Sequence, residues 1–267
     1  MPSEPTPSPT PVSPYKPDWI RTYKTVATAE LKAHGFSPKE TRSAEKRPGF
    51  AFFHPGGWNM GEPAWGYDLC HHYADLGMVA VSFQYRLSSI GGTTPVDAIS
   101  DARSAVRWIR KSGTEIGLDP GRLLVMGISA GAHLALSTAM LPGPDDPSDD
   151  TAISTVADAL LLQSASADPA SGSQFIELLQ GKGRPEDYSP AHHIRPHLPP
   201  MCFIHGIADD IVSHDSVREF VAAMKKAGNS CELHSFEGTD HFFRRKEDQV
   251  AALAAMDAFV RGLGYIS

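Results

Sequence analysis

The sequence predicts an α/β fold, with a mostly parallel central sheet covered by helices on both faces. Short apolar runs alternate along the chain with amphipathic stretches of helical length, a pattern typical of parallel strands joined by crossover helices. With 267 residues and 41% hydrophobic content, the chain can form one large domain of this kind or two small ones. The motifs described below need a single sheet, so we expect one domain over residues 21–267.

The expected strands are apolar runs bounded by turn-forming residues. The first extends from Tyr23 to about Phe36 and ends near Gly35 and Pro38. The later runs are short and continuously apolar, which indicates strands buried on both faces. They cover residues 49–53, 78–83, 123–126, 159–162 and 201–204, and a last strand is expected at 231–236.

Helices are expected between these strands. They cover residues 65–76, 95–111, 132–136, 217–226 and 248–259. Pro95 suits the first position of its helix, and Val96, Ile99, Val106 and Ile109 follow on one apolar face.

Two stretches interrupt the alternation. Residues 142–150 are rich in proline and aspartate, which predicts a surface loop away from the mouth of the fold. Residues 164–200 form a longer insertion with one helical piece at 174–180. Because this insertion is small, we expect a minimal lid and a shallow, open cleft that suits bulky substrates or short acyl groups.

The N-terminal segment predicts a disordered linker over residues 1–20. Prolines at positions 2, 5, 7, 9, 11, 14 and 17 alternate with serine and threonine, and such a segment cannot bury a core. It has no basic region followed by an apolar one, so it is not itself a signal peptide. Linkers of this kind often follow a removed signal, so we expect a secreted or periplasmic protein, with a cytoplasmic one as the alternative.

Charge and cysteine content limit the partners. A net charge of −7 argues against nucleic acid, which needs a basic face. No run approaches the 18 or so apolar residues that a membrane span requires. Of the three cysteines, Cys202 and Cys231 lie in predicted strands, where a buried free thiol is expected. The oligomeric state is left open.

Four short motifs carry the chemistry, and they occur in a fixed order. They are His54-Pro55-Gly56-Gly57-Trp58, Gly127-Ile128-Ser129-Ala130-Gly131, His205-Gly206-Ile207-Ala208-Asp209 and Gly238-Thr239-Asp240-His241. The second is a G-x-S-x-G motif between an apolar run and a helix-permissive stretch. In that context the serine lies on a strained turn that exposes its hydroxyl above the carboxyl end of the sheet.

With these motifs the chain resembles the α/β-hydrolase superfamily from about Thr22 to the C-terminus. More narrowly, it is similar to small bacterial esterases with an HGG-type oxyanion loop, including acetyl-xylan and feruloyl esterases. The resemblance implies a serine carboxylesterase for short acyl esters, with acetyl or feruloyl esters of plant polysaccharide among the substrates. The alternatives are an arylformamidase-like or peptidase-like serine hydrolase and a non-catalytic binding protein of this fold.

Ser129, His241 and Asp209 are the predicted catalytic residues. A serine hydroxyl needs a base within about 3 Å, and an imidazole that titrates near neutrality can accept the proton and return it. His241 is the candidate base, and His234 is the nearest rival, in a strand. The resemblance implies Asp209 as the carboxylate that orients the histidine, with Asp210 as the alternative.

The oxyanion donors are expected from two places. One is the backbone N–H of Ala130, directly after the nucleophile. The others are Gly56 and Gly57, since Pro55 has no N–H and is a departure from the usual HGGG loop. Trp58 and Tyr85 are candidates for the substrate pocket, although both are equally plausible core aromatics.

No metal or cofactor is expected. His192, His193 and His197 form a cluster, but no carboxylate or cysteine pattern accompanies them and Pro196 interrupts the helix that such ligation needs. Neither a G-x-G-x-x-G nor a Walker loop occurs, so a nucleotide cofactor is unsupported. The expected partner is a small-molecule or polysaccharide-linked ester.

Overall fold

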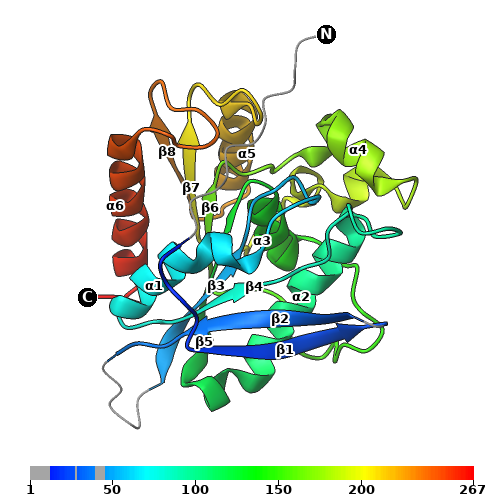
Figure 1. The fold of residues 1–267 in the computed structure, drawn as a ribbon. Coiled ribbons are helices and arrows are strands. Elements are labelled where there is room, and N and C mark those ends of the chain that lie inside the picture. The colour runs from blue at the N-terminus through cyan, green and yellow to red at the C-terminus, as the bar shows by residue number, and fades with distance from the viewer. Residues whose placement is uncertain (1–12, 28, 40–45) are drawn as a thin grey trace.

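The computed structural model describes residues 13–27, 29–39 and 46–267, and it confirms the predicted α/β architecture. Within these residues, eight strands form one sheet in the order β1-β2-β4-β3-β5-β6-β7-β8, with helices on both faces (Figure 1). The strands are β1 (Trp19–Val26), β2 (Ala29–Phe36), β3 (Arg47–Phe53), β4 (Val79–Phe83), β5 (Leu118–Ile128), β6 (Ala159–Gln163), β7 (Met201–Gly206) and β8 (Cys231–Phe236).

The strands divide into a parallel body and an antiparallel edge. Strands β3 to β8 run parallel, and every residue of β4 and β7 is buried, as expected for strands covered on both faces. Their carboxyl ends therefore meet at one edge of the sheet, where the loops that carry the candidate residues emerge.

The prediction of one early strand over 23–36 is wrong. Two antiparallel strands, β1 and β2, occupy this stretch, and the chain turns at Ala27, whose φ is 48°. The turn has no glycine, proline or asparagine, so the sequence pattern continues through it unbroken. Strand β1 begins at Trp19, two residues before the predicted domain start, and residues 1–12 of the predicted linker lie outside the described residues.

The helices follow the predicted alternation closely. They are α1 (Tyr67–Asp75), α2 (Pro95–Ser112), α3 (Ala130–Met140), α4 (Ser173–Leu179), α5 (His214–Lys226) and α6 (Lys246–Gly262). Helix α2 begins with Pro95 in its first turn, and the Asp97 carboxylate accepts the N–H of Thr94 at 2.8 Å. None of the helices in the described part of the chain combines the length and apolarity that crossing a bilayer requires.

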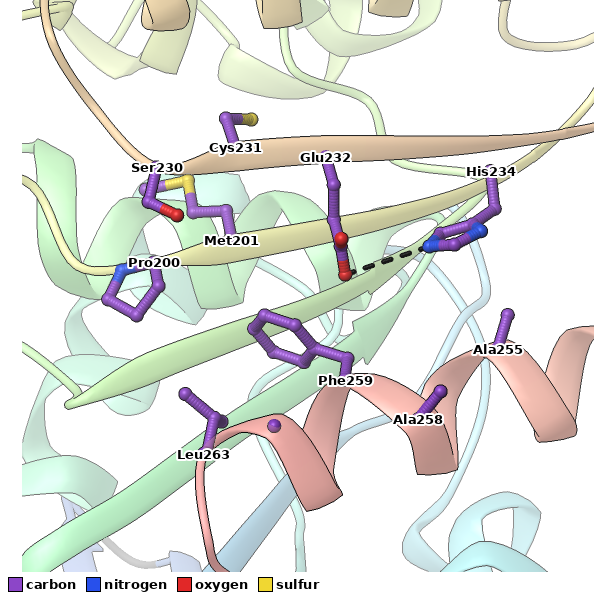
Figure 2. A pocket seen from close by; sticks show the side chains of 11 residues that line it. Pro200, Met201, Ser230, Cys231, Glu232, His234, Ala255, Ala258, Phe259 and Leu263 are labelled. Carbon is purple, nitrogen blue, oxygen red and sulfur yellow. Dashed lines mark ion pairs between the residues drawn. The ribbon is translucent and has the colours of Figure 1, made fainter.

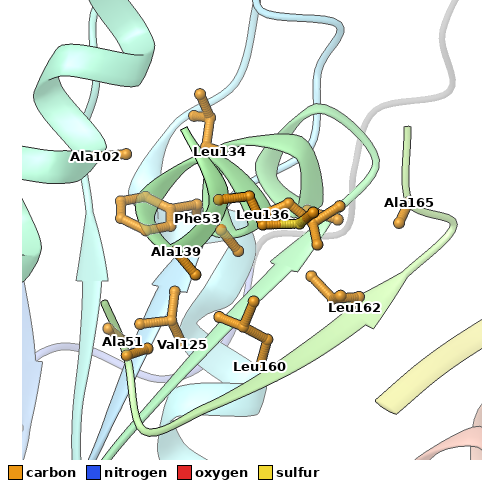
Figure 3. Packing of buried hydrophobic residues seen from close by; sticks show 14 of the residues in the cluster. Ala51, Phe53, Ala102, Val125, Leu134, Leu136, Ala139, Leu160, Leu162 and Ala165 are labelled. Atoms are coloured by element: carbon orange, nitrogen blue, oxygen red, sulfur yellow. The ribbon is translucent and has the colours of Figure 1, made fainter. Parts of the chain in front are cut away.

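The core lies on both faces of the sheet. Residues of α2, α3 and α5 pack on one face, and residues of α1 and α6 pack on the other. Helix α3 is buried along its whole length, and Figure 3 shows Leu134, Leu136 and Ala139 of this helix over Val125 and Leu160 of the sheet. This burial fixes the helix that begins directly after Ser129.

The two predicted interruptions differ in how they are held. The loop at 142–150 is tied to α2, because Asp145 lies 2.7 Å from both Arg103 and Arg107. The insertion at 164–200 contains the short helix α4, as predicted, and three single 3₁₀ turns. Helix α4 lies above the carboxyl ends of the strands, where a small lid is expected (Figure 1).

Candidate active site

Ser129 lies on a sharp turn between β5 and α3. Its backbone has φ 54° and ψ −118°, a strained conformation for a residue with a side chain. A Cβ on Gly127 would lie 2.1 Å from the Gly131 carbonyl oxygen, and a Cβ on Gly131 would lie 2.1 Å from that of Phe53. Only glycine fits at these two positions, which is the physical reason for the G-x-S-x-G spacing.

Ser129, His241 and Asp209 form a continuous hydrogen-bonded chain. The Ser129 Oγ lies 2.9 Å from His241 Nε2, and His241 Nδ1 lies 2.8 Å from Asp209 Oδ2. The carboxylate only accepts, so Nδ1 carries the proton and Nε2 is free to accept from the serine hydroxyl. The imidazole is therefore arranged to take a proton from Ser129.

Asp209 is held as an anion. Burial alone would raise its pKa, but hydrogen bonds from His205 and His241 outweigh burial and hold the pKa well below its usual range. Its Oδ1 also accepts the backbone N–H groups of Ile211 and Val212 at 2.9 and 2.8 Å. These bonds fix the carboxylate in one orientation toward His241.

Asp210 and His234, the predicted alternatives to Asp209 and His241, lie outside this hydrogen-bonded chain. Asp210 is exposed in the same loop, and His234 lies on β8 with its Nε2 3.6 Å from Glu232. Neither contacts Ser129. The structure thus brings together Ser129, His241 and Asp209 from the predicted set.

The loop at 54–61 lies beside Ser129 and presents the two predicted glycine donors. Gly56 and Gly57 have φ values of 131° and 57°, which a glycine adopts without strain, and both line the cavity that contains Ser129. Ala130 is the first residue of α3, so its N–H has no partner within the helix. Gly56 and Gly57 thus line the same cavity as Ser129, and Ala130 directly follows it.

Tyr85 does not line the cavity, so of its two predicted alternatives the core position holds and the pocket position does not. Its hydroxyl donates to the His54 carbonyl at 2.9 Å, and its ring stacks on the His54 ring at 4.1 Å. The Nδ1–H of His54 in turn donates to the Pro55 carbonyl at 2.8 Å, and burial lowers the His54 pKa to about 4. Tyr85 therefore stabilises the 54–61 loop through His54 and is a buried core residue.

Trp58 lines the cavity, as predicted, and links the 54–61 loop to the lid. Its indole N–H donates to His133 Nδ1 at 3.1 Å, and His133 Nε2–H donates to the Tyr188 carbonyl at 2.8 Å. An indole only donates and a carbonyl only accepts, so these partners fix the His133 tautomer. Burial lowers the His133 pKa to about 4, which keeps the ring neutral at ordinary pH.

The Ser129 cavity has a volume of about 900 Å³ and is mainly apolar. Trp58 and Phe175 of α4 form an aromatic wall, with their rings 5.0 Å apart. At the mouth, Met60, Ile211 and Phe242 are exposed. The cavity combines a small polar end with an apolar body, as is usual for sites that bind small molecules.

Several residues of the site escaped the sequence analysis. His205 belongs to the motif that predicts Asp209, but the motif alone does not indicate a role for the histidine. His133 lies one helical turn after Ser129, and this spacing could have indicated a position beneath the nucleophile. Phe175 lies within the predicted lid helix. The role of each depends on contacts with distant segments, which a single sequence does not reveal.

The predicted histidine cluster makes separate contacts. His193 Nε2 lies 3.1 Å from the Asp187 carbonyl, and His192 Nε2 lies 3.6 Å from Asp168. Among the described residues, the group that brings three metal-ligating atoms together is instead Cys202, Glu232 and His234. The three cysteines are buried free thiols, as predicted for Cys202 and Cys231.

Curated proteins with similar sequences are esterases by name. The chain is 25% identical over 221 residues to a probable isoprenylcysteine alpha-carbonyl methylesterase, ICMEL1, of Arabidopsis thaliana, covering 74% of this chain and 46% of that protein. It is 30% identical over 191 residues to esterase LipQ of Mycobacterium tuberculosis, covering 65% of this chain and 45% of that protein. The chain spans about half the length of the curated relatives it matches.

Solved structures match over nearly the whole chain. Native esterase 2 of Thermogutta terrifontis has a TM-score of 0.86 and 36% identity, covering 93% of each chain. Its butyrate-bound form has a TM-score of 0.87 and 34% identity, covering 98% of each chain. Residues 50–245 also match the family described as alpha/beta hydrolase fold. From this match, the sheet order and the turn at Ser129, the chain belongs to the alpha/beta hydrolase fold family.

Proposed function

We propose that this chain is a serine carboxylesterase that hydrolyses short-chain acyl esters through an acyl-enzyme on Ser129. The observation that carries the proposal is the hydrogen-bonded chain from Ser129 through His241 to Asp209, at the end of an apolar cavity. The similar proteins named as esterases support the same reaction class.

The geometry suits acyl transfer in two steps. Ser129 Oγ bonds to the acyl carbon while its proton moves to His241 Nε2, and the resulting imidazolium is stabilised by Asp209. The carbonyl oxygen becomes an oxyanion that accepts N–H groups of Ala130 and of Gly56 or Gly57. His241 then gives the proton to the departing alcohol, and water repeats the sequence to release the acid and restore Ser129.

Two observations favour short acyl groups: the aromatic wall of Trp58 and Phe175, and the short carboxylates bound in similar solved structures. Thermogutta terrifontis esterase 2 has been solved with propionate and with butyrate bound, and also phosphorylated by paraoxon. The exposed apolar mouth at Met60, Ile211 and Phe242 leaves room for a bulky alcohol outside the cavity. An acetyl or feruloyl ester of a plant polysaccharide is a substrate of this kind.

The decisive experiment is a series of p-nitrophenyl esters from acetate to octanoate. We expect kcat/KM to be highest for the shortest acyl groups and to fall steeply with chain length. In Ser129→Ala, turnover should drop by roughly 10³-fold or more. Ser154→Ala is the control, since Ser154 is an exposed serine that does not line this cavity, and its activity should be unchanged.

A flat or absent series would overturn the short-acyl proposal. Turnover of an N-aryl formamide or of peptide anilides in that case, lost in Ser129→Ala, would indicate an amidase or a peptidase. Absence of all turnover, together with no labelling of Ser129 by a fluorophosphonate, would indicate a non-catalytic binding protein of the same fold.

A further inference from the structure

A second cavity lies between the edge of the sheet and helix α6. Its volume is about 580 Å³, and Glu232 and His234 of β8 line it together with Phe259 of α6. Figure 2 shows Glu232 and His234 pointing from β8 toward this helix, while Cys231 points away from it. This cavity shares no lining residue with the Ser129 cavity, so the proposed esterase reaction does not account for it.

Three different ligand types converge at this edge. Cys202 Sγ, a Glu232 carboxylate oxygen and a His234 ring nitrogen lie within 4.8 Å of one another. The register of the sheet explains why: Cys202 of β7 pairs directly with Glu232 of β8, and His234 lies two residues further along β8 on the same face. Two hydrogen-bonded strands therefore hold all three side chains on the α6 side.

We propose that Cys202, Glu232 and His234 bind a divalent cation of the zinc type, with water from the second cavity as a further ligand. A thiolate, an imidazole and a carboxylate are the ligands that Zn²⁺ takes, whereas Mg²⁺ and Ca²⁺ prefer oxygen alone. Ligand atoms around one tetrahedral zinc lie about 3.5 Å apart, so only small side-chain movements are needed from the present spacing.

The three residues differ in solvent exposure, and the difference suits the binding of a metal ion from solvent. The side chains of His234 and Glu232 are 39% and 48% exposed, whereas Cys202 is fully buried beneath them. A hydrated ion can therefore reach the imidazole and carboxylate first. Binding then forms a bond between the ion and Cys202 Sγ and releases the thiol proton to solvent.

The site lies where an ion would stabilise the sheet edge. In the described part of the chain, β8 is the last strand and pairs with β7 alone, so its other side has no neighbouring strand there. An ion shared by Cys202 and the two β8 residues would tie these strands together. The same strands lead into the loops that carry Asp209 and His241, so the ion would also steady both loops.

The test is titration of the chelator-treated, full-length protein with Co²⁺ as a spectroscopic substitute for Zn²⁺. We expect a thiolate-to-Co²⁺ charge-transfer band that Zn²⁺ abolishes by displacement. Saturating Zn²⁺ should raise Tm by about 5 °C. The band should disappear in Cys202→Ser and persist in Cys231→Ser, the matched control, because Cys231 packs on the opposite face of the sheet.

Two variants keep the test informative if Cys202→Ser fails to fold. Glu232→Gln and His234→Asn change exposed side chains, and each should weaken Co²⁺ binding at least about tenfold. Absence of the band at millimolar Co²⁺ would overturn the proposal. So would a band that survives Cys202→Ser or that is lost in Cys231→Ser. None of these three results depends on ester turnover, so this proposal and the proposed function fail separately.

Discussion

Two buried polar regions of this molecule use charge in opposite ways. The histidine network lies at the carboxyl ends of the strands and consists of Ser129, Asp209 and four histidines: His54, His133, His205 and His241. The ionic network joins β1, α2 and the 142–150 loop through Lys24, Arg86, Arg103, Arg107, Asp97, Asp101, Asp145, Asp146 and Asp149.

The difference shows how one fold separates stability from chemistry. In the ionic network every carboxylate faces an amine or guanidinium that stays charged at neutral pH; Asp101, for example, lies 2.8 Å from both Lys24 and Arg86. In the histidine network the single carboxylate, Asp209, faces the imidazoles of His205 and His241, and His241 is placed to take up and release a proton. The first region is suited to hold segments together, and the second to move protons.

Asp209→Asn gives the largest expected effect. The amide N–H₂ would face His241 Nδ1 and favour the wrong tautomer, so we expect kcat/KM to fall by about 10⁴-fold. The fall would be measured with p-nitrophenyl acetate. Asp210→Asn is the matched control, since Asp210 is the exposed neighbour in the same loop, and it should retain activity. The reverse result would assign the orienting carboxylate to Asp210.

Asp101→Asn should act on stability and leave the reaction alone. It removes one of the two carboxylate partners of Lys24 and of Arg86, at a position where the Asp101 side chain is 0% exposed. Asp146 and Asp97 remain as the second partners. Removing one partner of a buried ion pair costs up to about 3–5 kcal/mol of unfolding free energy, and the remaining partners should keep the loss toward the lower end of that range; urea unfolding would measure it. The folded variant should keep its kcat/KM.

Asp187→Asn is the control for this comparison. Asp187 pairs with Arg184 at 2.6 Å, but both side chains are exposed, so the loss of unfolding free energy should be much smaller than in Asp101→Asn. Equal losses in Asp101→Asn and Asp187→Asn would show that the ionic network contributes no more than an ordinary surface pair.

What could be predicted from the sequence depends on whether a feature has a local sequence signal or rests on contacts between distant segments. The turn at Ser129 has a local signal, the G-x-S-x-G pattern, even though Gly131 is required by the distant Phe53 carbonyl, and the apolar runs predict the parallel strands. The β1–β2 turn at Ala27 has no such local signal. Other features depend on which distant segments pair, and no local sequence pattern indicates that pairing. Examples are the contact between Trp58 and His133 and the group of Cys202, Glu232 and His234.

Acid should weaken the two networks in different pH ranges. Burial lowers the pKa of His133, and likewise of His54, to about 4. Between about pH 6.5 and pH 4 the unfolded chain binds protons that the folded chain does not, so stability is lost as the pH falls through this range. Burial alone would raise the pKa values of Asp145 and Asp146, but their hydrogen bonds and ion pairs lower them to about 2. Their contribution is therefore lost only from about pH 4 to pH 2.

His133→Gln separates the two ranges. Each buried histidine accounts for at most about 3 kcal/mol of the unfolding free energy that is lost between pH 6.5 and pH 4. Over that range His133→Gln should therefore lose less unfolding free energy than the unmodified protein, by up to this amount. Below pH 4 the variant and the unmodified protein should respond alike, because the ionic network is unchanged. Unfolding free energies measured by urea from pH 3 to pH 7 would test both statements. A variant curve parallel to that of the unmodified protein from pH 6.5 to pH 4 would show that His133 is not the buried neutral link between the 54–61 loop and the lid.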